Sequence, residues 1–98
     1  MRIEILPEAE DDLVMGAKFY ERMRPGLGEY FLNSLYSDID SLLLYAGVHR
    51  VIFGFYRALS KRFPFAIFYR LDRDKELIRV YRVLDLRRDP LWIRERLR

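Results

Sequence analysis

The chain has 98 residues, of which 51% are hydrophobic, 15% aromatic and 34% charged, and its net charge is +3. This composition is too hydrophobic for a disordered chain and too charged for a membrane protein, so we expect one globular domain over residues 1–98. The chain has no cysteine and one histidine, which excludes disulfides and thiolate metal sites; we expect neither a metal nor a cofactor. The N-terminal stretch turns acidic before any apolar run long enough for a signal peptide, which indicates a cytoplasmic protein.

Charge is distributed unevenly along the chain. Residues 1–49 contain 4 Lys or Arg and 9 Asp or Glu, whereas residues 50–98 contain 14 and 6. This asymmetry predicts an acidic shoulder and a basic working face for an anionic partner, provided that the two halves lie on different surfaces. Ordinary solvated charges that cluster by chance are the alternative.

The first half of the chain has helical periodicity. A short strand at residues 3–5 precedes Pro7, and apolar residues then recur at helical spacing from Ala9 to Tyr20. Pro25-Gly26 ends this helix, and a second helical pattern extends from Leu27 to Ala46, with Gly47 as a natural cap. The short connection predicts an antiparallel helical hairpin.

From residue 49 the hydrophobic period falls to two. Alternation over 51–56, 65–70 and 77–82 predicts three consecutive strands, and Asp89-Pro90 is typical of a helix start. The predicted fold is α+β, with the order β-α-α-β-β-β-α and the helical hairpin on one face of a mainly antiparallel four-stranded sheet. The opposite face, carrying Tyr, Phe and Arg side chains, would be left to solvent or to a partner.

Few residues suggest catalysis by themselves. His49 lies at a helix-to-strand junction, where a solvated turn residue is a better interpretation than a member of a catalytic triad. The acidic run Glu8, Glu10, Asp11 and Asp12 fans around the start of the first helix, so the helix dipole explains it better than a metal site does.

Four segments resemble one known family. They are FYE (19–21), PGLG (25–28), YRALSKRFPFAIFY (56–69) and VLDLRRDP (83–90). Together with the element order, they resemble the RelE/ParE toxins of type II toxin–antitoxin operons, over nearly the whole chain. The resemblance implies the same fold and an antitoxin partner, which has a DNA-binding N-terminal domain and an acidic C-terminal segment.

The resemblance also implies one of two activities. RelE-like members cleave mRNA in the ribosomal A site with basic side chains; here the middle-strand arginine falls at Ala66, and the C-terminal tyrosine is replaced near Trp92, whose indole cannot transfer the proton. ParE-like members lack the RNase set and are similar to poisons of DNA gyrase. We therefore expect a ParE-like, noncatalytic toxin of a plasmid stabilisation module. A RelE-like ribosome-dependent mRNA endoribonuclease is the alternative, and a basic domain without toxicity is a third interpretation.

The resemblance places the functional residues around the last three strands and the segments that follow them. The expected toxin working face consists of Arg57, Lys61, Arg62, Tyr69, Arg82, Arg87 and Arg88, and the expected antitoxin contacts are Phe53, Phe55, Phe63 and Trp92. As alternatives, Arg57 and Arg82 can pair with Asp85 or Glu76 at the sheet, and Trp92 can pack the C-terminal helix on the sheet.

Overall fold

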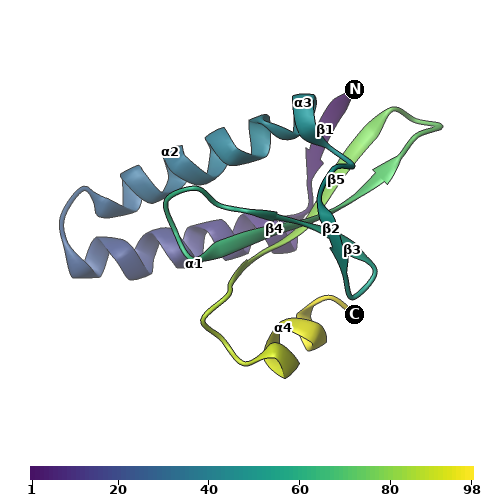
Figure 1. Cartoon of the computed structure of the whole chain (residues 1–98). Coiled ribbons are helices and arrows are strands. Elements are labelled where there is room, and N and C mark those ends of the chain that lie inside the picture. Colours follow the sequence, from purple (N-terminus) through teal and green to yellow (C-terminus); the bar gives the residue numbers. More distant parts are fainter.

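The computed structural model describes residues 1–98 and contains five strands and four helices (Figure 1). The strands form one sheet in the order β1-β5-β4-β3-β2, in which β1 is parallel to β5 and all other neighbours are antiparallel. Along the chain the elements are β1 (Arg2–Ile5), α1 (Pro7–Met23), α2 (Leu27–Asp40), α3 (Leu42–Tyr45), β2 (Arg50–Ile52), β3 (Phe55–Leu59), β4 (Phe65–Asp72), β5 (Leu77–Asp85) and α4 (Pro90–Arg96).

Helices α1 and α2 form the predicted antiparallel hairpin, side by side in Figure 1. The Glu21 carboxylate accepts hydrogen bonds from the backbone N–H groups of Gly26, at 3.1 Å, and Gly28, at 3.0 Å, and so caps the start of α2. Gly28 lets the helices approach closely, because a Cβ there would lie 2.6 Å from the carbonyl oxygen of Ala17. The FYE and PGLG segments therefore form a single structural unit, the helical turn.

The main core lies between this hairpin and one face of the sheet. The apolar stripe predicted for the first helix is buried there, and Phe31 of α2 fills the space that Gly16 leaves open. The buried members are Ala9, Leu13, Tyr20, Phe31, Leu35, Ile39, Leu42, Ala58, Phe65, Ile67, Tyr69, Ile78, Val80 and Val83.

The prediction of four strands is wrong, because the segment read as one strand over 51–56 is a hairpin. Phe53 and Gly54 have φ values of 54° and 82° and form a two-residue turn between β2 and β3. The predicted second helix is divided as well. The Ser41 hydroxyl donates to the carbonyl oxygen of Asp38 at 2.6 Å, where α2 ends and the short α3 begins.

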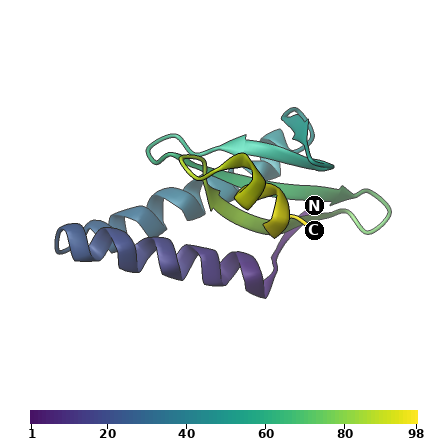
Figure 2. The ribbon, with the colours of Figure 1, turned by 90° about the horizontal axis from the view of Figure 1, so that it is seen from below.

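The second face of the sheet is not left entirely open as predicted, because α4 covers part of it (Figure 2). Ile93 and Leu97 pack on Phe68 and its neighbours to form a second, smaller core. The predicted start of this helix is confirmed: the side chain of Asp89 accepts from the Leu91 N–H at 2.8 Å, and Pro90 is the first helical residue. None of the helices has both the length and the hydropathy that a bilayer crossing requires.

Candidate binding surface

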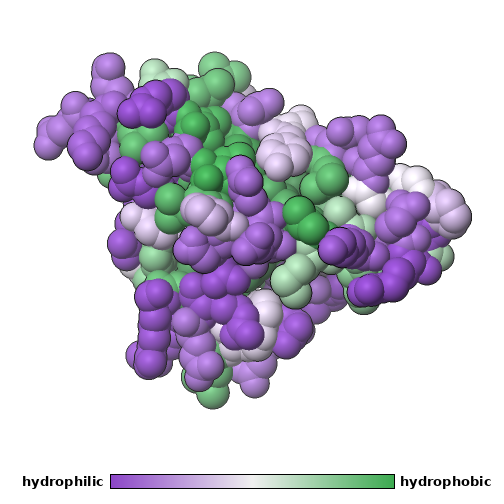
Figure 3. All heavy atoms as spheres, turned by 180° about the vertical axis from the view of Figure 1, so that it is seen from behind, coloured by the Kyte–Doolittle hydropathy of each residue, from purple (hydrophilic) through white to green (hydrophobic).

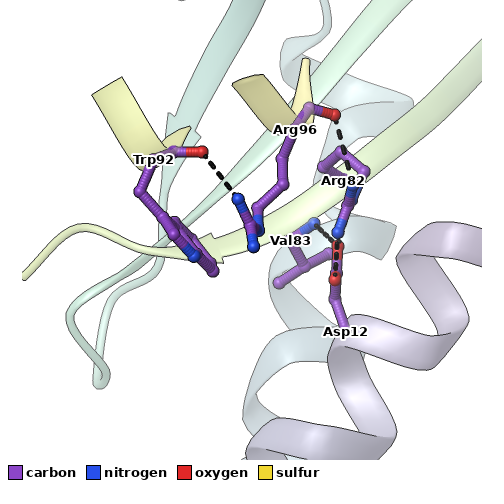
Figure 4. A network of polar contacts seen from close by, with 5 residues as sticks. All are labelled: Asp12, Arg82, Val83, Trp92 and Arg96. Atoms are coloured by element: carbon purple, nitrogen blue, oxygen red, sulfur yellow. Dashed lines mark hydrogen bonds and ion pairs between the residues drawn. The ribbon is translucent and has the colours of Figure 1, made fainter. Parts of the chain in front are cut away.

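An arginine on β5 connects three elements (Figure 4). Arg82 donates two hydrogen bonds of 2.8 Å to the carboxylate of Asp12 on α1, which also accepts from the Val83 N–H at 3.0 Å. The third bond of Arg82, 3.2 Å long, goes to the carbonyl oxygen of Arg96 on α4. The hydrogen bond with Asp12 is the main reason that the pKa of Arg82 is raised. Through these bonds Arg82 links both α1 and the last turn of α4 to β5.

A groove of about 580 Å³ lies between α1 and α4, and we call it the α1–α4 groove. Its lining combines apolar residues, which we call the floor, with charged residues, which we call the rim, and the two together suit a peptide that has both kinds of side chain. The floor consists of Met15, Gly16, Phe19, Phe65, Val83, Leu84 and Trp92, and the rim consists of Asp12, Arg22, Arg82, Asp85, Arg88 and Arg96.

The groove has excess positive charge. Its two acidic residues are already neutralised, Asp12 by Arg82 and Asp85 by Arg87, whose closest contact to Asp85 is 2.7 Å. The remaining cations at the rim, Arg22, Arg88 and Arg96, have no carboxylate within ion-pair distance. A segment that places apolar side chains on the floor and carboxylates at the rim would complement both properties.

Two of these cations are held by Trp92. The guanidinium carbons of Arg88 and Arg96 lie 4.1 Å and 3.8 Å from the centre of the indole ring, and Arg96 also donates to the carbonyl oxygen of Trp92 at 3.2 Å. Such cation–π contacts contribute about 0.5–1 kcal/mol each at exposed sites. Trp92 also packs α4 on the sheet, as the sequence allowed, so one ring both anchors the helix and positions the rim.

The ion pair of Asp85 predicts a pH dependence of stability. Burial by itself would raise the pKa of Asp85, but hydrogen bonds from the side chain and backbone of Arg87 outweigh burial and lower the pKa. A carboxyl group whose pKa is lower in the folded than in the unfolded chain stabilises the fold at pH values above its unfolded-state pKa. This stabilisation is lost as the pH falls through its folded-state pKa. We expect Arg87→Gln to be destabilising at about pH 6 and nearly neutral at about pH 2, where the carboxyl is protonated. Urea unfolding at both values, with Arg50→Gln as a control on the distant strand β2, measures this; an equal effect at both pH values contradicts it.

The structure disperses several residues of the expected working face. Arg87 and Arg88 follow β5, and Arg88 lines the α1–α4 groove, but Lys61 and Arg62 are exposed in the β3–β4 connection and do not. That connection is fixed to α2, because the buried carboxylate of Asp38 accepts from the Ser60 hydroxyl at 2.7 Å and from the Lys61 N–H at 3.3 Å. Asp38 had no predicted role.

Tyr69 lies in the core and not on the surface where it was expected. Its side chain has no exposed area, and its hydroxyl accepts from the Gly47 N–H at 2.9 Å and is hydrogen-bonded to Nδ1 of His49. Burial raises the pKa of Tyr69 and lowers that of His49. The pair fastens the segment between α3 and β2 to the centre of the sheet, so His49 is partly buried and not a freely solvated turn residue.

The four expected antitoxin contacts do not form one surface. Phe63 belongs to an aromatic cluster, with its ring centre 4.8 Å from that of Tyr20 and 5.0 Å from that of Phe31. Phe55 is buried, and Phe53 is half-exposed at the β2–β3 turn. Of the four, Trp92 lines the α1–α4 groove.

Sequence reasoning missed the part of the groove that α1 contributes. Met15, Phe19 and Met23 are 69%, 44% and 64% exposed and recur every four residues, beside the buried stripe. A second apolar stripe on a helix that already has a buried one is a signal that could have indicated a binding surface. Neighbouring Arg22 was not among the expected site residues.

Exposed apolar side chains also occur away from the groove. Leu44 and Val48, near the edge strand β2, are 82% and 74% exposed. As a separate observation, Figure 3 shows a broken band of hydrophobic residues, bordered by hydrophilic ones, on the face seen from behind. We assign the α1–α4 groove as the candidate site because it combines apolar surface with uncompensated cations.

The structure thus defines a small α+β protein with a groove lined by apolar side chains and by arginines, three of which have no carboxylate partner. No group of three or more acidic or histidine side chains is placed to hold a metal ion. No family model and no curated protein matches the sequence. Among solved structures, a chain of the chromosomal ParDE TA system from P. aeruginosa has a similar fold: the TM-score is 0.77 and the identity 16%, over 88% of this chain and 96% of that chain. This likeness confirms the fold that the resemblance to the RelE/ParE family implied, with five strands in place of four.

Proposed function

We propose that this chain is the toxin of a type II toxin–antitoxin module of the ParE-like, plasmid stabilisation kind, which inhibits growth by binding DNA gyrase or another replication target. The observation that carries the proposal is the fold shared with a chain of a ParDE TA system over 88% of this chain. The α1–α4 groove supports it, because a toxin of this kind requires a surface for a neutralising partner.

The partner proposed for the groove is the acidic C-terminal segment of a cognate antitoxin, whose N-terminal domain binds DNA. Apolar side chains of the segment would cover Met15, Phe19 and Trp92, and its carboxylates would pair with Arg22 and Arg88. Such a segment folds on binding, and its ordering cost is offset by burial of this floor.

The geometry favours the noncatalytic branch over the RelE-like RNase. Cleavage through a 2′-hydroxyl requires a group that accepts a proton beside cations that hold the phosphate. Arg57 has no proton-accepting side chain in hydrogen-bond contact with its Nε. Ala66, where the RNase branch has an arginine, is buried, and the only histidine, His49, is hydrogen-bonded to Tyr69. Trp92 is covered by Arg88 and Arg96 and offers no titrating group.

The test is induced expression followed by assays with purified components. We expect growth arrest that co-expression of the product of an adjacent small open reading frame relieves, with inhibition of gyrase supercoiling or accumulation of cleaved DNA complexes. Ribosome-dependent mRNA cleavage with intact supercoiling would instead establish the RelE-like alternative. Unaffected growth would leave the nontoxic basic domain as the correct interpretation.

Charge reversal at the rim of the groove tests the antitoxin site. Arg22→Glu/Arg88→Glu is expected to weaken binding of the acidic segment by at least about tenfold, since each charged contact contributes on the order of 1 kcal/mol. The matched control is Arg24→Glu/Arg94→Glu, which makes the same charge change at exposed positions outside the groove. Titration calorimetry that finds equal affinities for the two double variants contradicts the site.

A further inference from the structure

A second concentration of arginine lies away from the groove. Arg50 of β2 is directly opposite Arg57 of β3, and Arg70 of β4 is directly opposite Arg79 of β5. Like charges directly opposite one another destabilise a sheet. Two such pairs in one small sheet therefore need a reason other than stability, and an anion bound between the guanidinium groups supplies one.

All four arginines project from the face of the sheet opposite the helical hairpin. Arg57 is in register with Phe68, which packs under α4, and the Arg70 guanidinium lies 3.9 Å from the ring centre of Phe55, a member of the same small core. Phe55 and Arg57 are two residues apart on β3, so the two pairs form rows about 7 Å apart. We call Arg50, Arg57, Arg70 and Arg79 the arginine face.

Most hydrogen-bonding capacity of the arginine face is unused. Arg50 and Arg57 have no carboxylate partner, and Nε of Arg57 is buried without any hydrogen bond. Because this Nε is buried, the terminal nitrogens of Arg57, which have no partner in the chain, are the ones left for an outside acceptor. Arg70 uses Nε on the carbonyl oxygen of Gly54, at 3.1 Å, which orients its terminal nitrogens, and Arg79 alone has an acid, Glu4 at 2.9 Å.

Two hollows, of about 490 and 270 Å³, share Arg70 and Tyr81 among their lining residues. Arginines outnumber acids in both of them, although each contains a carboxylate. The first is also lined by Tyr56, Leu71, Asp72, Arg73, Asp74 and Arg79, and the second by Leu6, Glu8, Phe55, Arg82, Arg96, Leu97 and Arg98. The surface is therefore both basic and uneven enough to receive protruding anionic groups.

We propose that the arginine face binds the phosphate backbone of duplex DNA. Guanidinium groups donate paired hydrogen bonds to phosphate oxygens, and two rows of them suit a series of phosphates better than a single anion. A single strand is a poorer fit, because such sites stack bases on open aromatic rings, and here Arg70 lies over the rings of Phe55 and Tyr81. An acidic peptide would also need apolar contacts, which the buried Phe55 does not offer.

Deoxyribose is favoured over ribose because the face has little to recognise a 2′-hydroxyl. Proteins that bind double-stranded RNA contact this group. Of the acids near the arginine face, Glu4 is bound to Arg79, and Asp72 accepts from the Lys75 N–H in the β4–β5 turn, where Asp74 also lies. None of the four arginines lines the α1–α4 groove, so DNA binding does not depend on the proposed antitoxin site or on toxicity.

Fluorescence anisotropy with a short labelled DNA duplex tests the proposal. We expect Arg50→Gln/Arg57→Gln/Arg70→Gln to weaken binding at least about tenfold and to reduce the slope of log K against log salt by about one for each lost phosphate contact. The control Lys18→Gln/Arg24→Gln/Lys61→Gln removes the same charge at exposed positions outside both the arginine face and the α1–α4 groove and should retain affinity within about twofold. Thermal unfolding separates binding from folding: Arg50→Gln/Arg57→Gln should maintain or raise the midpoint, because it removes an opposed pair that makes no ion pair in the chain.

Several outcomes would overturn the proposal. The first is a triple variant that binds the DNA duplex as tightly as the parent chain does. The second is a control variant that loses as much affinity for the duplex as the triple variant loses. The third is single-stranded DNA, or an RNA duplex of the same sequence, that the parent chain binds as tightly as the DNA duplex. If polyglutamate displaces the labelled duplex as effectively, per negative charge, as unlabelled DNA duplex does, the arginine face binds an acidic protein instead.

Discussion

Replacement of Asp12 by alanine is expected to lower the free energy of unfolding by about 3 kcal/mol. The change removes both 2.8 Å bonds to Arg82 and the acceptor of the Val83 N–H, and it leaves the Arg82 side chain, which is 21% exposed, without its ion-pair partner. Because Arg82 also contacts the last turn of α4, we expect that helix to loosen with it. Urea denaturation measures the loss of stability, and hydrogen exchange of α4 amides measures the loosening.

Two variants make the Asp12 result specific. Asp11→Ala removes the adjacent, exposed carboxylate and should change stability by about 0.5 kcal/mol or less. The double variant Asp12→Ala/Arg82→Met should be more stable than Asp12→Ala alone, because no buried charge is left unpaired. A cost below about 1 kcal/mol for Asp12→Ala, or no recovery in the double variant, would show that this pair does not hold the helices on β5.

Gly28→Ala is expected to destabilise the helical hairpin by about 2–3 kcal/mol, although alanine has the higher intrinsic helix propensity by about 1 kcal/mol. The added Cβ would lie 2.6 Å from the backbone carbonyl oxygen of Ala17 and 3.0 Å from Cβ of Glu21. A backbone atom cannot move aside as a flexible side chain can, so α1 and α2 must separate and the Glu21 cap must lengthen. Thermal and urea unfolding give the magnitude.

The control for Gly28 is Ser37→Ala, a change to alanine at an exposed position of the same helix. Its effect should be within about 0.5 kcal/mol, because only helix propensity changes there. If Gly28→Ala were as stable as the parent chain, the close approach of the helices would not be the reason for glycine at this position.

Local signals identified most elements and their ends. Pro25-Gly26 and Asp89-Pro90 act through backbone geometry within a few residues, and the helical period of α1 is a property of neighbouring turns, so these features could be predicted. The β2–β3 turn could not, because one glycine after a phenylalanine is a weak turn signal and Phe53 itself takes a positive φ.

The candidate site could be predicted only in part. Arg88 and Trp92 were identified from the segments after β5, but Arg22 and Met15 come from α1 and belong to the groove only because the fold brings α1 beside α4. The sequence also predicted that an acidic surface and a basic surface would be separate. They are less separate than expected, because two of the three ion pairs, Glu4 with Arg79 and Asp12 with Arg82, join the two halves of the chain.

The sequence by itself determined the α+β class, the helical hairpin with its Pro25-Gly26 turn, and the concentration of arginine after residue 49. Tertiary structure alone decided which arginines remain unpaired, because partners such as Asp12 and Arg82 are 70 residues apart. It also decided that Tyr69 is buried and that α4 covers part of the second sheet face. These outcomes depend on long-range burial and pairing, which no local pattern records.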